Sequence, residues 1–297
     1  MREFGIVIIH YGRSAPTIRC VDSVLAQHSS VPLKIVLVDN FGNLRRRDFP
    51  EEIQIITRRD NPGFGGGANA GVKALEEDCN CLAYLVLNND VVLCPNFIDA
   101  AAASFEDGEV GASGGSIRGS GEDGRLWYAG GDIRMMTGTV SQSRSESDAH
   151  HPRMVGFIPG TAIAVRREAW DEVGGFDESF FLYNEDIDLC LRLRRAGWRL
   201  RFCTQMLCIH DLGESTGSGV RSALYLEQLT KTRLRPFHPR IYQLYLCLVH
   251  SIYNLTRMAS IFLHRGLTGR TQIRAIMRGH LAAVCEVFGR NSDPERS

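Results

Sequence analysis

The sequence lacks an excess of charge of either sign. Its 297 residues include 34 lysines and arginines and 34 aspartates and glutamates. Such a chain has no global field to attract nucleic acid, so composition does not predict a nucleic-acid-binding protein. The charge is nevertheless uneven, because residues 231–278 contain many cations and no acidic residue.

Cysteine pairs at metal-binding spacing are also missing. Nine cysteines are scattered through apolar segments, and no two of them have Cys-x-x-Cys spacing. The sequence therefore predicts neither a zinc site nor a disulfide framework.

Long uninterrupted apolar runs are absent as well. Residues 241–263 come nearest to the length of a membrane span. Polar residues interrupt this segment: Gln243, His250, Asn254 and Arg257. The pattern favours a packed or interfacial helix. No signal peptide is predicted at the start, because Arg2 and Glu3 lead directly into a short apolar strand.

What the sequence does contain is an alternation of apolar runs with amphipathic segments. Strands are expected at residues 6–9, 33–38, 53–56 and 82–87, with helices after the first and the third. This alternation predicts an α/β fold with a mostly parallel sheet flanked by helices. Polar residues then fall at the carboxyl ends of strands, where such sheets bind ligands.

The later parts of the chain are less regular. Residues 118–153 are rich in Gly, Ser and Asp and predict an excursion from the fold, with a hairpin around Trp127. Its composition suits either a lid or a surface loop. Further strands are expected within residues 155–165 and at 200–202, and the chain from Ala223 onward is predicted to be helical and basic.

The most informative segment runs from Gly174 to Gly197. Aromatic residues precede three carboxylates, Glu185, Asp186 and Asp188, at a predicted helix start, where the helix dipole favours acids. Apolar residues follow at helical spacing until Gly197. A carboxylate at such a junction faces a cleft and can act as a general base. The alternative is that the acids only cap the helix.

Three other polar residues follow apolar runs. Asp90 ends a strand after two asparagines and can hold a divalent cation against a diphosphate, or open an Asx turn. Asp39 can accept an N–H from a nucleotide base, or open an ordinary turn. His210 can complete a metal shell with Asp90, or serve as a structural hydrogen-bonding residue.

A glycine-rich segment supports a rival interpretation. Residues 63–67 together with Asn69 predict a turn that lets backbone approach a ligand closely. Gly65, Gly67 and Ala70 superficially match a dinucleotide-binding fingerprint, with Asp90 about 20 residues further on. This favours a nicotinamide- or flavin-dependent oxidoreductase. Against it, the segment comes after the third strand, whereas the fingerprint normally follows the first.

Taken together and in this order, these motifs resemble the inverting glycosyltransferases of family 2, which have the Rossmann-like GT-A fold. The rhamnosyltransferase-like branch of bacterial polysaccharide assembly is the most similar. The resemblance extends from about Ile6 to Ser215 and more faintly to the C-terminus. It is carried by Ile8-Ile-His-Tyr11, Val38-Asp-Asn40, residues 61–71, Leu87-Asn-Asn-Asp90, Pro159-Gly-Thr161, Arg166-Arg-Glu168, residues 174–178, residues 181–189, and His210 with Gly213 and Ser215.

The resemblance implies a role for each matching residue. The residues implied to bind the nucleotide-sugar are Tyr11, Asp39, Asn61, Phe64, Asn69, Asn88, Asn89 and Asp90. Asp90 would also bind Mn²⁺ or Mg²⁺, with His210 as a further ligand. Asp186 would deprotonate the acceptor hydroxyl, and Glu185 would orient this base or the acceptor. Acceptor contacts are implied for Thr161, Tyr183 and Arg233.

Some positions depart from the family pattern. Asn88 stands where many relatives have Asp, which removes one anionic metal ligand. His10-Tyr-Gly12 replaces the usual Thr-Tyr-Asn. The cations Lys231, Arg233 and Arg235 would hold an acceptor pyrophosphate, lie against anionic lipid, or form a solvated helix face.

The resemblance also implies an organisation and a function. Residues 1–220 would form the catalytic domain, with a nucleotide-sugar half at about 1–115 and an acceptor half at about 155–220. Residues 221–297 would be helical and would touch a membrane surface without spanning it.

The expected function is metal-dependent transfer of a sugar to a saccharide or lipid-linked acceptor of the cell envelope. We expect it at the inner face of the cytoplasmic membrane. The favoured donor is dTDP-rhamnose. UDP-galactofuranose, UDP-hexoses, UDP-N-acetylhexosamines, the oxidoreductase and a non-catalytic scaffold remain as alternatives.

Overall fold

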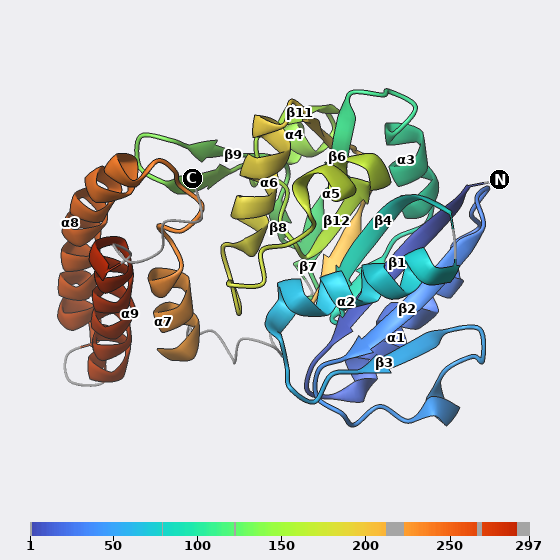
Figure 1. Cartoon of the computed structure of the whole chain (residues 1–297), viewed down its shortest axis with the longest axis horizontal. Helices are drawn as coiled ribbons and strands as arrows, with labels where there is room; N and C mark the ends of the chain where they lie inside the picture. The colour runs from blue at the N-terminus through green and yellow to red at the C-terminus, as the bar shows by residue number, and fades with distance from the viewer. Residues whose placement is uncertain (1, 79, 122, 212–222, 266–268, 290–297) are drawn as a thin grey trace. The chain divides into compact units, whose positions relative to one another are not determined.

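The computed structural model describes residues 2–78, 80–121, 123–211, 223–265 and 269–289 (Figure 1). Gly213 and Ser215 of the last motif above lie outside these residues. The chain divides into two compact units. The sheet unit comprises Met1–Asp132, Val140–Phe181 and Glu185–Ser215, and the helical unit comprises Ile133–Thr139, Leu182–Asn184 and Thr216–Ser297.

The sheet unit is organised around an eight-stranded sheet. Its strands are β1 (Glu3–His10), β2 (Leu33–Asp39), β3 (Gln54–Thr57), β4 (Cys81–Asn88), β6 (Val110–Gly114), β11 (Arg153–Val155), β12 (Ala162–Arg166) and β13 (Arg199–Phe202). Their order is β11-β13-β6-β12-β4-β1-β2-β3. The half from β3 to β4 is parallel, as expected, whereas β12 runs antiparallel to both of its neighbours.

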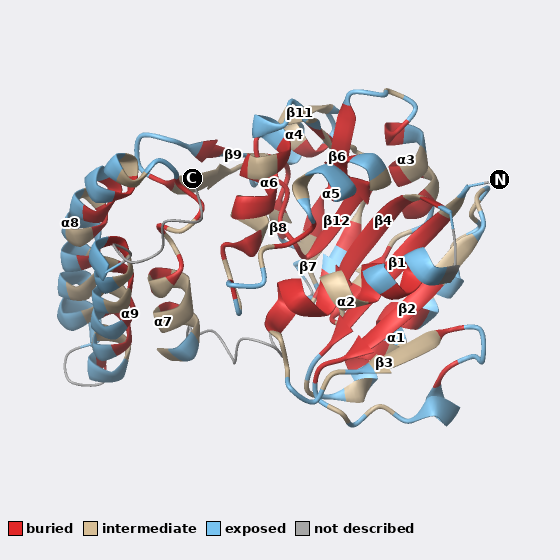
Figure 2. Cartoon of the chain, in the orientation of Figure 1, coloured by how far each residue is buried: buried red, intermediate tan, exposed pale blue. Residues whose placement is uncertain are grey.

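The apolar runs explain why these strands are central. Seven consecutive residues of β1 are buried, so both faces of the strand are covered, as is typical of parallel sheets with helices on each side. The flanking helices are α1 (Ser14–Leu25), α2 (Gly63–Asp78), α3 (Phe97–Ser104), α5 (Arg167–Val173) and α6 (Glu185–Arg195), with a short 3₁₀ turn, η1 (Arg46–Asp48). Figure 2 shows β1, β4 and β12 buried along most of their length, whereas β3 is only partly buried.

A second, four-stranded sheet has the order β5-β14-β7-β8. Its strands are β5 (Val91–Leu93), β7 (Ile117–Gly119), β8 (Leu126–Tyr128) and β14 (Cys208–His210). The chain continues through β9 (Gly131–Arg134), β10 (Thr139–Gln142) and α4 (Glu146–Ala149). The prediction of a loop excursion over residues 118–153 was therefore wrong in part, because short strands do not produce a strong sequence period. The hairpin expected around residues 127–131 is not formed by those residues, because β8 pairs with β7 and β9 pairs with β10.

Among the described cysteines, Cys81 is disulfide-bonded, which the sequence did not predict, and seven carry free thiols. Burial raises the pKa of Cys190 to about 12 and that of Cys203 to about 11. Thiols of this kind stay protonated at neutral pH and are poor nucleophiles.

The helical unit contains α7 (Ala223–Lys231), α8 (Arg240–Arg265) and α9 (Arg270–Gly289), as the sequence predicts. Helix α9 packs against α7 around a small core of Leu226, Ala275 and Ile276. An ion pair between Arg278 and Glu227, 2.8 Å long, joins the same two helices.

Helix α8 buries polar side chains and exposes apolar ones, which is the reverse of the usual arrangement in a water-soluble domain. Its buried side carries Gln243, His250 and Asn254 besides Leu246 and Cys247. Its exposed side carries Ile241, Tyr245, Leu248, Ile252, Leu255 and Phe262. By length and composition alone, α8 is long and apolar enough to cross a membrane, despite its polar interruptions, and only 22% of that segment is buried (Figure 2).

Candidate active site

The carboxyl ends of three neighbouring strands bring most of the predicted donor residues to one edge of the sheet. In the parallel register, His10 of β1 pairs with Asp39 of β2, and Ile9 pairs with Asn88 of β4. Tyr11, Asp39 and Asn88 are therefore neighbours, although they are far apart in the sequence. This is the edge at which open α/β sheets bind ligands.

Asp39 shapes the loop that follows it. The carboxylate is buried and accepts the backbone N–H groups of Phe41 (3.0 Å), Gly42 (2.6 Å) and Leu44 (3.0 Å). The loop presents the ring of Phe41 beside that of Tyr11, with centroids 5.1 Å apart at 81°. Both rings are more than half exposed, so they form an accessible aromatic pair. Phe41 was not among the predicted site residues, because its only signal is its place directly after the Asp-Asn turn.

The two asparagines before Asp90 differ in their surroundings. The Asn88 backbone N–H donates to the carbonyl of Thr161 at 3.0 Å, which ties β4 to the turn before β12. The side-chain amide of Asn89 donates to Thr17 Oγ1 at 2.9 Å. His10 is buried against the same threonine, with Nδ1 2.6 Å from Oγ1, and burial lowers its pKa. His10 and Asn89 thus link β1, α1 and the end of β4 through Thr17. A direct contact between Asn89 and the donor stays a prediction.

Asp90 and His210 are brought together by strand pairing. His210 of β14 pairs with Val91 of β5 in the antiparallel register, so His210 lies beside the residue that follows Asp90. The imidazole Nε2 lies 3.1 Å from Oδ1 of Asp90. Both side chains are largely buried, and the indole ring of Trp127 packs edge-on to the imidazole at 6.2 Å.

The pair fits a divalent cation. Within the described part of the chain, neither ring nitrogen of His210 makes a hydrogen bond, although both are buried. A buried imidazole and a carboxylate oxygen at this separation are suitable ligands for Mn²⁺ or Mg²⁺. Among the described residues, no third His, Cys, Asp or Glu joins them. Sites that hold a cation against a diphosphate commonly have few protein ligands, because phosphate oxygens and water complete the shell.

The glycine-rich segment is not a loop but the first turn of α2, which begins at Gly63. A Cβ added at Gly65, Gly66 or Gly67 would lie within 3.0 Å of Phe176, Pro62 or Asn40, respectively. These three glycines therefore allow other parts of the same chain to pack closely against the helix. The space beside them is filled and cannot hold a pyrophosphate, which removes the main support for the oxidoreductase interpretation.

Asn61, Asn69 and Phe64 flank this turn. Asn61 precedes the helix at a φ of 43°, and its Oδ1 accepts the Gly63 N–H at 3.4 Å. The Asn69 amide donates to the Phe176 carbonyl (2.8 Å) and accepts its N–H (3.0 Å). Asn69 thus anchors the segment that leads to Glu185 and Asp186, and its role in the donor pocket stays a prediction.

Gly160 connects this region to Asp186. Its backbone N–H donates to Oδ2 of Asp186 at 3.1 Å. A Cβ on Gly160 would lie 3.2 Å from the ring of Phe64 and 3.4 Å from Cβ of Asp186, so only glycine fits between them without movement. The next residue, Thr161, is buried and pairs with Asn88. Asp186 is thereby fixed at the same sheet edge as the donor residues. No feature of the sequence identified Gly160 as a partner of Asp186.

Glu185 and Asp186 are the first two residues of α6. Burial, together with the charge of Asp186, raises the pKa of Glu185 to about 8. Burial also raises the pKa of Asp186, while N–H groups of Gly160 and Ile187 oppose this shift. At neutral pH Glu185 therefore largely keeps its proton and is uncharged. Oε2 of Glu185 is buried and has no hydrogen-bond partner within the described residues.

The other two acceptor candidates belong to the helical unit. Tyr183 has a φ of 67° and packs edge-on against Tyr225 with centroids 4.7 Å apart. The guanidinium of Arg233 lies over the ring of Tyr253 at 5.1 Å and 3.4 Å from Nδ1 of His250. Their contact with an acceptor stays a prediction.

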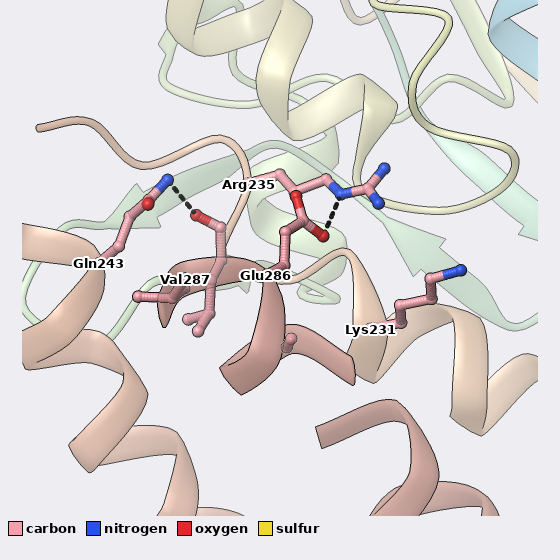
Figure 3. A pocket seen from close by; sticks show the side chains of 7 residues that line it. Lys231, Arg235, Gln243, Glu286 and Val287 are labelled. Carbon is pink, nitrogen blue, oxygen red and sulfur yellow. Dashed lines mark hydrogen bonds and ion pairs between the residues drawn. The ribbon is translucent and has the colours of Figure 1, made fainter. Parts of the chain in front are cut away.

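The helical unit also contains a small cavity beside the basic segment (Figure 3). Arg235 is paired there with Glu286 at 2.9 Å, and the ammonium group of Lys231 points away from this pair. The cavity volume is about 10 Å³, enough for one water molecule at most. This cavity is therefore too small for a pyrophosphate.

Comparisons with known proteins identify the family of the chain. A family model described as glycosyltransferase like family 2 matches residues 2–235. An N-acetylglucosaminyl-diphospho-decaprenol L-rhamnosyltransferase of Mycobacterium tuberculosis is 28% identical over 221 residues, which are 65% of this chain and 71% of the relative.

Solved structures show the same fold. GalNAc-T7 with UDP, GalNAc and Mn²⁺ superposes with a TM-score of 0.61 at 15% identity, over 79% of this chain and 48% of that one. A mannosyltransferase of Pyrobaculum calidifontis, solved with GDP-Man and Mn²⁺, superposes with a TM-score of 0.56 at 14% identity. The superposition covers 96% of this chain and 88% of the mannosyltransferase. The chain therefore belongs to glycosyltransferase family 2 and is a glycosyltransferase with the GT-A fold.

Proposed function

We propose that this enzyme transfers a sugar, with inversion at the anomeric carbon, from a nucleotide-sugar to a saccharide or lipid-linked acceptor. The observation that carries the proposal is the position of Asp186. Its carboxylate is held by the N–H of Gly160, at the sheet edge that also carries the Asp90–His210 pair. A base and a cation site at one edge are what this reaction requires.

The donor would bind along the ends of β1, β2 and β4. The exposed rings of Tyr11 and Phe41 offer a surface for the nucleotide base. Asp90 and His210 would hold Mn²⁺ or Mg²⁺, which when bound supplies positive charge to the leaving diphosphate. Asn61, Phe64, Asn69, Asn88 and Asn89 surround this region from α2 and β4, and Asp39 supports the loop carrying Phe41.

Asp186 would act as the general base. As the acceptor oxygen forms its bond to the anomeric carbon, Asp186 takes the hydroxyl proton, and the bond to the nucleoside diphosphate breaks on the opposite face. Glu185, neutral at physiological pH, adds no charge that would compete with Asp186 for this proton. Its protonated carboxyl can instead donate a hydrogen bond that orients the base or the acceptor.

The relatives support a donor and an acceptor class. The M. tuberculosis enzyme is named for transfer of L-rhamnose to a diphosphate-linked lipid saccharide. We therefore favour dTDP-rhamnose as donor and a lipid-linked saccharide as acceptor. UDP-sugars are the second candidate, since one structural neighbour contains UDP.

The helical unit would lie against an anionic membrane, at the inner face of the cytoplasmic membrane. The apolar stripe on α8 faces away from the packed core of its unit, and this helix has no acidic residue. An apolar face flanked by arginines is typical of helices that lie in the membrane interface.

The test is a binding and transfer panel. Melting temperature is measured with nucleotides and nucleotide-sugars, each with Mn²⁺ and with chelator, since ligands that bind the folded state raise it. We expect a metal-dependent rise with dTDP-rhamnose and transfer to a lipid-linked N-acetylglucosamine acceptor. A rise only with UDP-sugars would change the donor. No metal-dependent rise and no transfer with any donor would refute the proposal.

A further inference from the structure

A second cavity in the sheet unit lies next to the proposed cation site. Its volume is about 460 Å³, within the range of pockets that hold small ligands, roughly 300–1,000 Å³. The side chains that line it include Arg125, Trp127, Arg144, Asp211 and Ser120. Trp127 contacts the imidazole of His210, and the other four residues have no role in the catalytic arrangement described above.

The cavity is connected to the cation site by backbone and ring contacts. The N–H of Asp211 donates to the carbonyl of Asp90 at 3.0 Å, and Asp211 directly follows His210. The indole of Trp127, which lines the cavity, also packs on the imidazole of His210 at 6.2 Å. A ligand in this cavity would therefore be next to the bound diphosphate.

Two arginines give the cavity its charge. Within the described residues, the side chains of Arg125 and Arg144 make no hydrogen bond or ion pair, and both are exposed. Asp211, in contrast, is engaged by Ser120 at 3.1 Å and by Arg19 at 3.5 Å. Planar guanidinium groups bind phosphate oxygens in pairs, and an indole ring offers an apolar face to a sugar ring.

We propose that this cavity is the acceptor subsite and that it binds a saccharide joined to a phosphate or diphosphate. Trp127 packs against the acceptor sugar, and Arg125 and Arg144 bind its phosphate oxygens. This inference rests on the proposed function, because it names the acceptor class of the same site. It also assigns a binding role to Arg125, Trp127 and Arg144, which the sequence suggested only as parts of a lid or loop.

The experiment measures binding and transfer separately. The probe is N-acetylglucosaminyl diphosphate carrying a short prenyl chain, and its Kd is determined by calorimetry for the wild-type protein and for Arg125→Ala, Arg144→Ala and Trp127→Ala. A charge-assisted hydrogen bond lost from each arginine predicts an increase in Kd of about tenfold or more. Arg47→Ala, which removes an exposed arginine from η1, is the matched control and should leave Kd unchanged.

Competing probes separate the two parts of the ligand. Trp127→Ala should bind free N-acetylglucosamine more weakly than the wild type, whereas the arginine variants should bind it equally well. The arginine variants should bind inorganic diphosphate more weakly, whereas Trp127→Ala should bind it as the wild type does. Trp127→Phe keeps an aromatic ring and should restore part of the sugar affinity. Donor affinity, measured with nucleotide and Mn²⁺, should not change in the two arginine variants.

Several results would overturn the inference. Unchanged probe affinity in all three variants would show that the cavity does not bind the acceptor. A loss of donor affinity instead would assign the cavity to the donor. If the wild-type protein transfers no sugar but binds the probe through these residues, the proposed function fails while the subsite stands. If the wild-type protein transfers sugar and the variants keep their probe affinity, the subsite fails while the proposed function stands.

Discussion

Nε2 of His210 lies 3.1 Å from a carboxylate oxygen of Asp90, although the two residues come from distant parts of the chain. The antiparallel pairing of β14 with β5 produces this proximity. Neither ring nitrogen of His210 is hydrogen-bonded within the described part of the chain, so the imidazole is available as a ligand. The relationship supports a cation site that the sequence could only suggest.

The first prediction concerns this pair. Asp90→Ala and His210→Ala should each weaken nucleotide-diphosphate binding in Mn²⁺ by roughly 10-fold or more, because losing one ligand weakens the cation that bridges to the diphosphate. When a chelator removes the metal, the variants and the wild type should bind the nucleotide diphosphate with the same affinity. Titration calorimetry in both conditions checks this. Glu109→Ala, at an exposed ion pair with Arg199, is the control. Equal weakening with and without metal would argue against a ligand role.

The second prediction concerns the base. Asp186→Asn should lower kcat by about 10²–10⁴-fold, the usual contribution of a general base, and leave nucleotide binding intact. The amide can still accept the Gly160 N–H, so the local structure should persist. Steady-state transfer assays and nucleotide titrations measure both effects. Asp171→Asn, on an exposed part of α5, serves as the control. Unchanged turnover in Asp186→Asn would refute the assignment.

The third prediction follows from the raised pKa of Glu185, about 8 in the folded protein against 4.5 ordinarily. Between these values the folded state binds more protons than the unfolded chain, so the free energy of unfolding falls as pH rises from about 4.5 to 8. Glu185→Gln removes this dependence. The free energy of unfolding of Glu185→Gln, relative to that of the wild type, should therefore rise by on the order of a few kcal/mol between pH 4.5 and pH 8.

Urea denaturation at several pH values measures this difference. Comparing the two proteins cancels the titration of other groups, such as His250, whose pKa burial lowers to about 4. Glu51→Gln, an exposed glutamate before β3, is the matched control. A constant difference between pH 4.5 and 8 would contradict the prediction.

The fourth prediction concerns the apolar stripe of α8. Replacing Leu248 and Ile252 by serine should weaken binding to anionic phospholipid vesicles by tenfold or more, since each buried side chain contributes about 1.5–3 kcal/mol. Both residues are exposed, so folding should not suffer. Co-sedimentation with vesicles measures the effect, and Leu25→Ser on α1 is the control. If the variant instead changes only the oligomeric mass, the stripe joins two copies of the chain.

Much of the fold could be predicted from local pattern. The runs at residues 6–9, 33–38 and 82–87 are apolar apart from Lys34, and they became β1, β2 and β4 because a strand covered on both faces accommodates such a run. Helix α6 was predicted from three acids at its start and Gly197 after its end. The short strands β7 to β10 were not, because three or four residues are too few to show a period.

The candidate site was predictable as a set of residues, but not in its contacts. Asn69 and Asp39 were identified as donor residues, yet the structure shows them holding the backbone at Phe176 and the 41–44 loop. Phe41, Gly160 and Trp127 were not singled out for the site. Their importance depends on neighbours more than 20 residues away, and no local pattern records such neighbours.

The sequence by itself determined the α/β class, the strand-end positions of Asp39 and Asp90, and the acidic start of α6. These features depend on backbone geometry and on side-chain period, which act over a few residues. Only the tertiary structure decided that Gly160 would hold Asp186, that His210 would face Asp90, and that Trp127 would line a cavity beside them. Such contacts depend on strand order, register and close packing, in which the whole chain takes part.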